Sequence, residues 1–229
     1  MIKLLILFIL FIFLILAFLL YSNYRFEGLE NIDIGLNKDI ETIPPIYVIN
    51  LKDRTDRKFK IEDKLRKHGL TGKFVGAVNG AELDIKNLEE KGFLNIKRKL
   101  MKRGEIACYL SHIKCWFEIL KSDSSMGLIF EDDIILKSDF VPSLSKKLNS
   151  IKDKKWDIFY LGRTCYLNIL CSDSACITGE NVDDDIIYPK TIGWGTFAYI
   201  IKRETIMKIL SEMFPINQPI DWILPNLYD

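Results

Sequence analysis

The distribution of apolar and polar positions divides residues 44–222 into alternating strands and helices. Short apolar runs with β-branched and aromatic residues predict buried strands, and they occur at 46–49, 74–78, 128–130, 156–162 and 196–201. Apolar residues at helical spacing predict helices at 54–68, 104–120, from 139 onward, and at 203–213. This alternation is typical of an α/β domain with a mostly parallel sheet. Its first strand, helix and strand predict a right-handed βαβ unit.

Two of the expected helices have apolar positions that define the face each should bury. In residues 54–68 these positions are Phe59, Ile61 and Leu65. In residues 104–120 they are Ile106, Leu110, Ile113 and Phe117. Residues 163–190 have no such pattern and are expected to form a long acidic loop, of a length that points to function rather than simple connection.

The first 22 residues differ from the rest, because no charged or polar side chain occurs between Leu4 and Leu20. A helix of this length spans the hydrocarbon core of a bilayer. We therefore predict a transmembrane signal-anchor at residues 1–22 and a stem at 23–43, with a cleaved signal peptide as the alternative. The single apolar run predicts a single-pass membrane protein, and because Lys3 precedes this run, the positive-inside rule predicts a cytosolic N-terminus. Its C-terminal domain is expected on the lumenal or extracytoplasmic side, in the Golgi or ER if the protein is eukaryotic or viral.

Charge and cysteine content argue against a nucleic-acid-binding protein and against a structural zinc protein. With 32 Lys and Arg against 31 Asp and Glu, the chain is not expected to bind nucleic acid through bulk electrostatics. The five cysteines include no Cys-x-x-Cys pair, so no structural zinc site is predicted. Cys108 and Cys115 are expected in the core of one helix. The other three, for which a lumenal location would allow one disulfide, are Cys165, Cys171 and Cys176.

Three adjacent acids interrupt the apolar segment GLIFEDDIIL at residues 127–136. Glu131, Asp132 and Asp133 follow an apolar run that predicts a buried strand, and another apolar run comes after them. Neighbouring carboxylates repel one another and resist leaving water, so a positive partner is expected, with a surface turn as the alternative. A second acidic run, Asp183–Asp185, follows no clear buried strand and is interpreted as part of a loop.

Polar residues from Asn50 to Arg57 follow the first predicted strand. Because ligands of such sheets collect at the carboxyl ends of the strands, these residues and the three acids are expected at one edge. Arg54 and Arg57 lie three apart and suit a phosphate group near a helix N-terminus, although a solvated helix face is the alternative. A hard divalent cation between the acids and a diphosphate would join both groups of residues into one site.

Six motifs of the sequence resemble glycosyltransferase family 25, in the order found there. They are INLKDRTDR (49–57), RGEIACYLSH (103–112), LIFEDDIIL (128–136), WDIFYLG (156–162), GWGTFAYII (193–201) and PID (219–221). The family includes bacterial lipooligosaccharide galactosyltransferases and procollagen galactosyltransferase domains. The resemblance implies a GT-A type nucleotide-sugar-binding fold over residues 44–229.

The resemblance also implies roles for individual residues on the donor side. Glu131 and Asp133 would hold a divalent metal, usually Mn²⁺, against the diphosphate of a UDP-sugar, with Asp132 beside them. The nucleotide side would be formed by residues that match the first motif, namely Asn50, Arg54 and Arg57. Glu105, Ser111 and His112 match the second motif. His112 is expected to reach the donor, or else to be a buried histidine with satisfied hydrogen bonds.

The implied reaction is transfer of a hexose, galactose or glucose, from UDP to a hydroxyl of a glycan, glycolipid or glycoprotein acceptor with inversion. Asp221 is the candidate base that takes the acceptor proton, and a helix N-cap is its alternative role. Trp194 is expected to stack on a sugar or to be a buried aromatic residue. The alternative function is a non-catalytic, membrane-tethered recognition module, which would lack metal-dependent UDP binding.

Overall fold

A computed structural model describes residues 43–95, 101–164, 179–183, 186–189 and 194–226. These residues belong to one compact unit, residues 41–229. The predicted anchor lies outside the described residues, as does the predicted stem apart from residue 43. In the described part of the chain, no helix is both long enough and apolar enough to cross a membrane.

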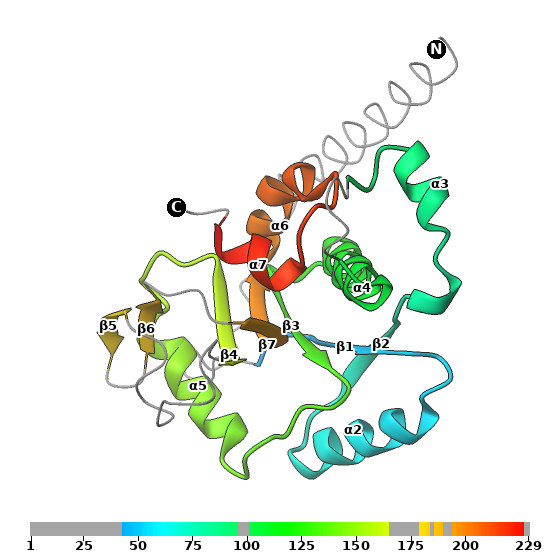
Figure 1. Ribbon diagram of the computed structural model, residues 1–229. Helices are drawn as coiled ribbons and strands as arrows, with labels where there is room; N and C mark the ends of the chain where they lie inside the picture. The colour runs from blue at the N-terminus through cyan, green and yellow to red at the C-terminus, as the bar shows by residue number, and fades with distance from the viewer. Residues whose placement is uncertain (1–42, 96–100, 165–178, 184–185, 190–193, 227–229) are drawn as a thin grey trace, which may run out of the picture. The chain divides into compact units, whose positions relative to one another are not determined.

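A five-stranded sheet forms the centre of the unit, in the order β2-β1-β3-β7-β4 (Figure 1). Its strands are β1 (Ile46–Asn50), β2 (Gly72–Gly76), β3 (Met126–Glu131), β4 (Ile158–Thr164) and β7 (Trp194–Lys202). β1 pairs in parallel with both β2 and β3, whereas β7 runs antiparallel to its neighbours β3 and β4. Four of the five strands therefore share one direction, which confirms the predicted α/β class with a mostly parallel sheet.

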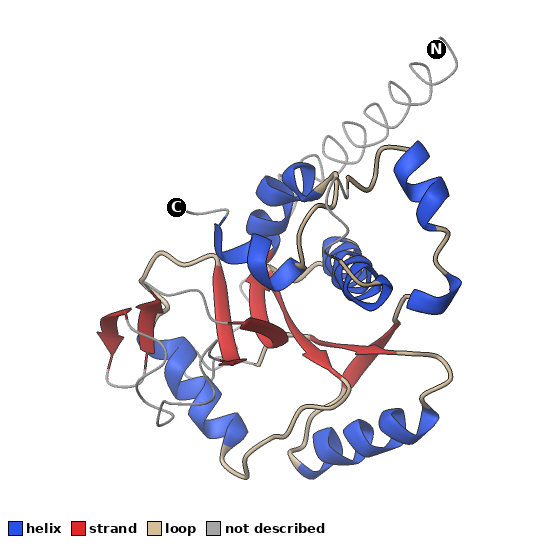
Figure 2. Cartoon of the chain, viewed as in Figure 1, coloured by secondary structure: helices blue, strands red, loops and turns tan. Residues whose placement is uncertain are grey.

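Helices cover both faces of this sheet, as Figure 2 shows. On one face lie α4 (Arg103–Leu120), α6 (Arg203–Ile209) with its 3-10 extension Leu210–Met213, and α7 (Ile220–Asn226). The opposite face carries α2 (Thr55–Lys67) and α5 (Phe140–Ser150). A short 3-10 turn (Gly80–Glu82) and α3 (Ile85–Glu90) precede α4. The unit β1–α2–β2 is the predicted βαβ unit, since its two strands are parallel neighbours.

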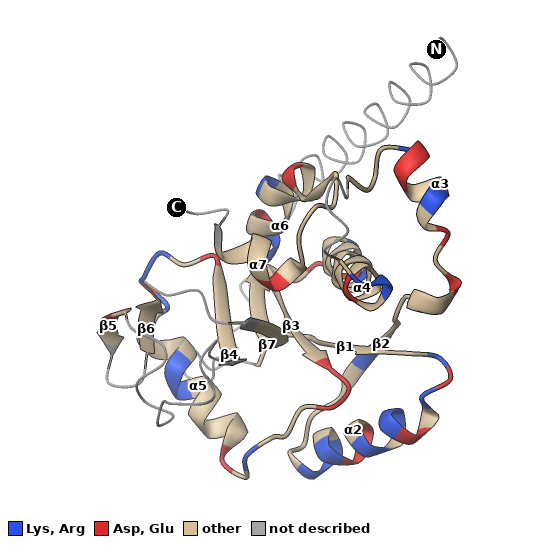
Figure 3. Cartoon of the chain, viewed as in Figure 1, with Lys and Arg blue, Asp and Glu red and all other residues tan. Residues whose placement is uncertain are grey.

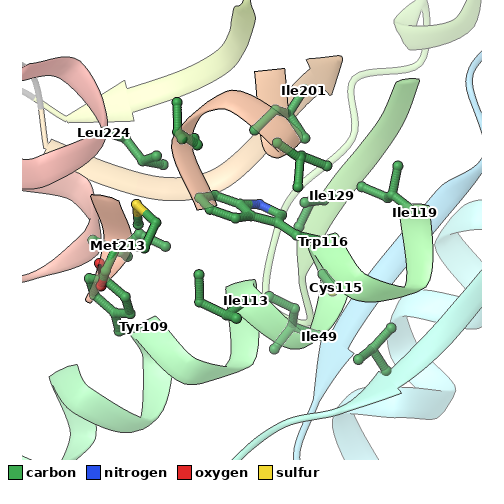
Figure 4. Close-up of a cluster of buried hydrophobic side chains, with 14 of the residues drawn as sticks. Ile49, Tyr109, Ile113, Cys115, Trp116, Ile119, Ile129, Ile201, Met213 and Leu224 are labelled. Atoms are coloured by element: carbon green, nitrogen blue, oxygen red, sulfur yellow. Dashed lines mark hydrogen bonds between the residues drawn. The ribbon is translucent and has the colours of Figure 1, made fainter. Parts of the chain in front are cut away.

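Alternation along the strands creates two cores, because successive side chains of a strand point to opposite faces. Ile49, Ile129 and Ile201 pack toward α4. Leu128 and Phe130 pack toward α2 and α5 in the second core. Figure 4 shows the first core, in which Trp116 of α4 reaches into the apolar side chains that line the sheet.

The buried face of α4 differs from the face predicted for it. Ile106 and Ile113 are buried as expected, but Phe117 is 44% exposed. Tyr109 and Trp116 are fully buried in its place. Their polar atoms have partners, because the Tyr109 hydroxyl donates to the Met213 carbonyl at 2.6 Å and the Trp116 indole N–H donates to another buried side chain. Satisfied polar atoms make the burial of such side chains favourable, which an apolar pattern alone does not reveal.

Three further expectations are wrong in detail. Ile61 and Leu65 of α2 are buried, but Phe59 is 69% exposed, because two residues rotate the chain about 200° around a helix axis. The apolar residues on both sides of the three acids predict burial of the whole stretch 128–136, but β3 ends at Glu131 and Ile135 is 87% exposed. The stretch expected to be a loop contains the hairpin β5 (Gly179–Asp183) and β6 (Ile186–Pro189). Its three cysteines and two of the acids in the Asp183–Asp185 run lie outside the described residues.

A candidate active site at the carboxyl ends of the strands

The carboxyl ends of β1 and β3 lie side by side at the topological switch point of the sheet. From β1 the chain continues to β2 on one side, and from β3 it continues through α5 to β4 on the other. Open α/β sheets bind their ligands in the crevice at such a point. Asn50 is the last residue of β1 and Glu131 the last of β3, so the structure brings the predicted residues to one edge.

Asp132 joins the two strand ends. Its Oδ2 accepts a hydrogen bond from Nδ2 of Asn50 at 2.8 Å, and its Oδ1 forms an ion pair with Arg57, also at 2.8 Å. Both carboxylate oxygens are therefore engaged, and only 10% of the side chain is exposed. The Asn50 amide also donates to the Arg54 carbonyl at 3.2 Å. We conclude that Asp132 fixes the β1–α2 loop against the end of β3.

Arg57 also contacts Asp133, whose Oδ2 lies 3.1 Å from the guanidinium and whose side chain is 55% exposed. The hydrogen bond to Asp132 raises the pKa of Arg57. The positive end of the α2 dipole favours the two carboxylates near this first turn of the helix. Figure 3 shows the acidic segment that follows β3 in red. Two of the three acids thus have a positive partner.

The two arginines that were expected to share a face point to different partners. Arg54 donates through Nε and Nη2 to both oxygens of Asp56, at 2.8 Å each. This bidentate pair raises the pKa of Arg54 and holds the pKa of Asp56 below its usual range. Arg57 alone therefore faces the acids, and Arg54 would have to leave Asp56 to bind a phosphate.

Glu131 points the other way, toward α4. Its Oε1 lies 3.4 Å from the Thr196 hydroxyl and 3.6 Å from Nε2 of His112, and 29% of its side chain is exposed. His112 is fully buried, with Nδ1 3.0 Å from the Tyr199 hydroxyl and Nε2 3.2 Å from Thr196. Both ring nitrogens therefore have partners, so that any effect of His112 on the donor would pass through Glu131.

Cys108 completes this corner of the site. One ligand atom each from Cys108, His112 and Glu131 lies within 4.8 Å of the others. Burial, followed by the negative charges of Glu131 and Asp221, raises the pKa of the Cys108 thiol to about 12. The thiol is therefore protonated at neutral pH and is not a nucleophile. Cys108 is predicted as a core residue, but its four-residue spacing from His112 is the sequence signal that places both on one face of a helix.

Asp221 lies in the first turn of α7, where its Oδ2 accepts a hydrogen bond from the Gly195 N–H at 3.0 Å. It is thus within the helix and bonded to β7, rather than serving as the N-cap. Gly195 has a φ of 97°, a conformation that is rare for residues with a side chain. Trp194 precedes it as the first residue of β7.

The remaining residues of the second motif hold α4 in place. Glu105 accepts a hydrogen bond from the Lys102 N–H at 2.5 Å and so caps the first turn of α4. The Ser111 hydroxyl accepts from the Val78 N–H at 2.9 Å and donates to the Ala107 carbonyl at 2.6 Å. These bonds tie the chain that follows β2 to the helix that carries Cys108 and His112.

A cavity of about 1000 Å³ lies beside Asp133, between α5 and strands β4, β6 and β7. Aromatic side chains that contribute to its lining are Phe130, Phe140, Phe159, Tyr160 and Phe197. Concave, largely apolar pockets of this kind are where proteins bind small molecules.

Replacing Asn50 with Asp is expected to destabilise the protein in a pH-dependent way. The new carboxyl would lie about 2.8 Å from Asp132, and two carboxylates that share a site raise the pKa of one of them. The folded variant would then hold a proton that the unfolded chain releases, so its stability falls as the pH rises through the raised pKa, by about 1.4 kcal/mol for each pKa unit. Urea unfolding at pH 5 and pH 8 measures this loss.

Asn149→Asp at an exposed position of α5 is the matched control for this variant. It should change stability by less than about 0.5 kcal/mol at either pH. Equal behaviour of the two variants would show that Asn50 and Asp132 do not share a buried hydrogen bond.

The sheet and its charged edge fit a GT-A-like α/β fold. The sequence then identifies the family, because the sequence model of glycosyltransferase family 25, described as an LPS biosynthesis protein family, matches residues 43–224. This chain belongs to glycosyltransferase family 25. The resemblance inferred from the six motifs is confirmed.

Curated relatives agree with this assignment. The chain is 29% identical over 198 residues to procollagen galactosyltransferase 2 of Homo sapiens, covering 80% of this chain and 30% of that protein. It is 28% identical over 194 residues to a glycosyltransferase 25 family member of Drosophila melanogaster, with the same coverage. It is also 26% identical over 195 residues to inactive glycosyltransferase 25 family member 3 of Homo sapiens, covering 80% and 31%. The chain thus spans about 30% of the length of these relatives.

Proposed function

We propose that this chain is a glycosyltransferase that moves a hexose, galactose or glucose, from a UDP-sugar to an acceptor hydroxyl. The observation that carries the proposal is that the three adjacent acids differ in their partners and in their exposure. Asp132 is engaged by Asn50 and Arg57, whereas Asp133 is largely exposed and Glu131 partly so. Two carboxylates at the switch point thus remain available for a cation.

On the donor side, Asp133 and Glu131 would hold a divalent metal, which we propose is Mn²⁺. Carboxylate oxygens suit such hard cations, and the metal would act as a Lewis acid on the departing diphosphate. Arg57 lies within reach of Asp133 and adds a permanent positive charge for a phosphate oxygen. Asn50 supports the site by orienting Asp132, and Arg54 is a second phosphate ligand if it exchanges Asp56 for the donor.

On the acceptor side, Asp221 is the proposed base. One of its oxygens is held by the Gly195 N–H, which would orient the carboxylate toward an acceptor hydroxyl and its proton. Attack by that hydroxyl on the anomeric carbon, from the face opposite UDP, inverts the anomeric configuration of the sugar. Trp194 is proposed to stack on a sugar. We propose the acceptor to be a glycan, glycolipid or glycoprotein.

We also propose that residues 1–22 anchor the protein in a membrane as a single-pass helix, with the catalytic domain on the lumenal or extracytoplasmic side. The support is the uninterrupted apolar run from Leu4 to Leu20 and its length relative to a bilayer core. A crosslinking or protease-protection experiment on sealed vesicles tests this topology, since a cytosolic domain would be degraded by added protease.

The second candidate function is that of a non-catalytic recognition module, because one related human protein is named as inactive. The acids and Arg57 at the switch point form a preorganised charged edge. This edge favours the enzyme, because a module that only recognises other molecules would not require it. Metal-dependent binding of UDP separates the two candidates.

The test is release of UDP by the full chain in detergent, with UDP-galactose, UDP-glucose or UDP-N-acetylglucosamine as donor. We expect release from one donor in the presence of Mn²⁺ and loss of release with EDTA. Failure of UDP to bind folded protein in the presence of Mn²⁺, measured by calorimetry, would overturn the donor site and favour the non-catalytic module.

A further inference from the structure

Three side chains of different chemistry converge at the inner corner of the site. Cys108 and His112 lie one turn apart on α4, and Glu131 reaches them from the end of β3. Their sulfur, nitrogen and oxygen atoms lie within 4.8 Å of one another. We propose that Cys108, His112 and Glu131 form a binding site for one zinc-type ion, separate from the hard-metal position at Asp133, with its fourth position open to water.

The spacing of the three groups fits such an ion. Zinc bonds of about 2.0–2.3 Å place neighbouring ligand atoms of a tetrahedral site roughly 3.3–3.6 Å apart. Nε2 of His112 and Oε1 of Glu131 are already 3.6 Å apart. The remaining separations, within 4.8 Å, need to shorten by about 1 Å, which is within the reach of side-chain rotation.

The ligand chemistry separates this site from the proposed manganese position. A thiolate and an imidazole prefer zinc and other softer ions, whereas carboxylate and phosphate oxygens suit Mn²⁺ and Mg²⁺. Oε1 of Glu131 is the atom that faces His112 and Thr196. Glu131 is therefore shared with the proposed transferase site, but the zinc-type site itself does not depend on that function.

Electrostatics also favour a cation at this corner. Arg57 pairs with both Asp132 and Asp133 and offsets one of their two negative charges. Glu131 instead faces the His112 ring, which carries charge only when protonated. The Asp221 carboxylate contributes further negative charge near Cys108. A divalent ion would offset these charges in a largely buried environment, where Coulomb interactions are strong.

Hydrogen bonds behind His112 are already of the kind that supports a metal ligand. Ligating histidines donate their second N–H to a neighbouring acceptor, which fixes the ring. Nδ1 of His112 lies 3.0 Å from the Tyr199 hydroxyl, which also accepts the Trp116 indole N–H at 3.0 Å. A hydroxyl has two lone pairs, so Tyr199 can accept both donors while Nε2 turns its lone pair to the ion.

Binding therefore requires a small rearrangement of protons. Nε2 of His112 exchanges its contact with the Thr196 hydroxyl for the ion, and the Thr196 hydroxyl keeps Glu131 as an acceptor at 3.4 Å. The Cys108 thiol releases its proton to solvent as the sulfur binds the ion. In the ion-bound state, His112 keeps Tyr199 as a partner of Nδ1 and Thr196 keeps Glu131 as an acceptor.

Cobalt(II) tests the proposal directly, because it occupies zinc sites and gives a near-ultraviolet charge-transfer band when a cysteine thiolate binds it. The full chain, freed of metal with EDTA and dialysed, is titrated with Co²⁺ while its absorption spectrum is recorded. We expect a thiolate band and tetrahedral visible bands that saturate at one equivalent and disappear when Zn²⁺ is added. A spectrum of hexa-aquo cobalt throughout the titration would overturn the proposal.

Matched variants assign the ligands. Cys108→Ser should abolish the thiolate band and weaken Zn²⁺ binding at least tenfold, whereas Cys115→Ser, at a second buried thiol of α4, should leave both unchanged. A band that persists in Cys108→Ser would place the ion on another cysteine and overturn the proposal. Far-ultraviolet circular dichroism of each variant verifies that it is folded.

A second pair tests the support from Tyr199. Tyr199→Phe should weaken Zn²⁺ binding about tenfold, whereas Tyr109→Phe removes another buried hydroxyl of the same core and should have no such effect. Asp133→Asn should leave the cobalt spectrum intact, because Asp133 is outside the three ligands. If the protein shows an intact cobalt spectrum but releases no UDP, the proposed transferase function is rejected and the zinc-type site is retained.

Discussion

Replacing Asp133 with Asn is expected to reduce Mn²⁺-dependent release of UDP by at least about 100-fold, equivalent to about 3 kcal/mol of transition-state stabilisation. Asp133 is the most exposed of the three adjacent acids, and its Oδ2 lies 3.1 Å from Nη1 of Arg57. An amide keeps the size of the side chain but removes the negative charge that binds the cation. Initial rates over a range of Mn²⁺ concentrations measure the effect.

Asp153→Asn is the matched control for this variant. Asp153 is exposed in the turn that leads from α5 to β4, at the end of the sheet opposite the switch point, and its loss should leave the rate unchanged. Activity of Asp133→Asn that recovers fully at high Mn²⁺ would show that Asp133 contributes to metal affinity only. Unchanged activity at low Mn²⁺ would contradict its role as a ligand.

Gly195→Ala is expected to lower the free energy of unfolding by about 2–5 kcal/mol, the sum of two effects. A φ of 97° costs a residue with a Cβ about 1–2 kcal/mol. The added methyl group would also lie far inside contact distance of the Phe197 ring, and overpacking of this kind costs about 1–3 kcal/mol. Urea unfolding measures the loss.

Gly104→Ala provides the comparison, because an added Cβ there meets nothing within 4 Å and Gly104 lies within α4. It should raise stability by up to about 1 kcal/mol. Gly195→Ala should also impair activity in the folded fraction, since Gly195 holds Asp221 through its N–H and precedes Thr196. A variant as stable and active as the wild type would show that the turn at Gly195 is not strained.

The two halves of the site depend on different parts of the fold. Asp132 is held by residues of β1 and α2, whereas Glu131 is held by residues of α4 and β7. Adjacent residues at the end of one strand thus serve opposite faces of the sheet. This arrangement allows a ligand at the switch point to contact both helical layers.

Local pattern was sufficient for much of the architecture. The positions of β1, β3, α4 and the βαβ unit follow from apolar periodicity, and the location of the acids at a strand end follows from the run that precedes them. Periodicity was insufficient where polar aromatic residues replaced aliphatic ones in the core. Trp116 and Tyr199 are buried together because each satisfies a polar atom of the other, and that pairing joins residues 83 positions apart.

Residue patterns along the chain are enough to predict the fold class, the family and the edge of the sheet at which charged residues gather. The partner of each of those residues depends on the tertiary structure. Arg54 turned to Asp56 and Arg57 to Asp132, and Glu131 turned toward Cys108 and His112. The physical reason is that secondary structure depends on near neighbours in the chain, whereas ion pairs and metal ligands depend on side-chain directions that strand pairing and helix packing set between distant segments.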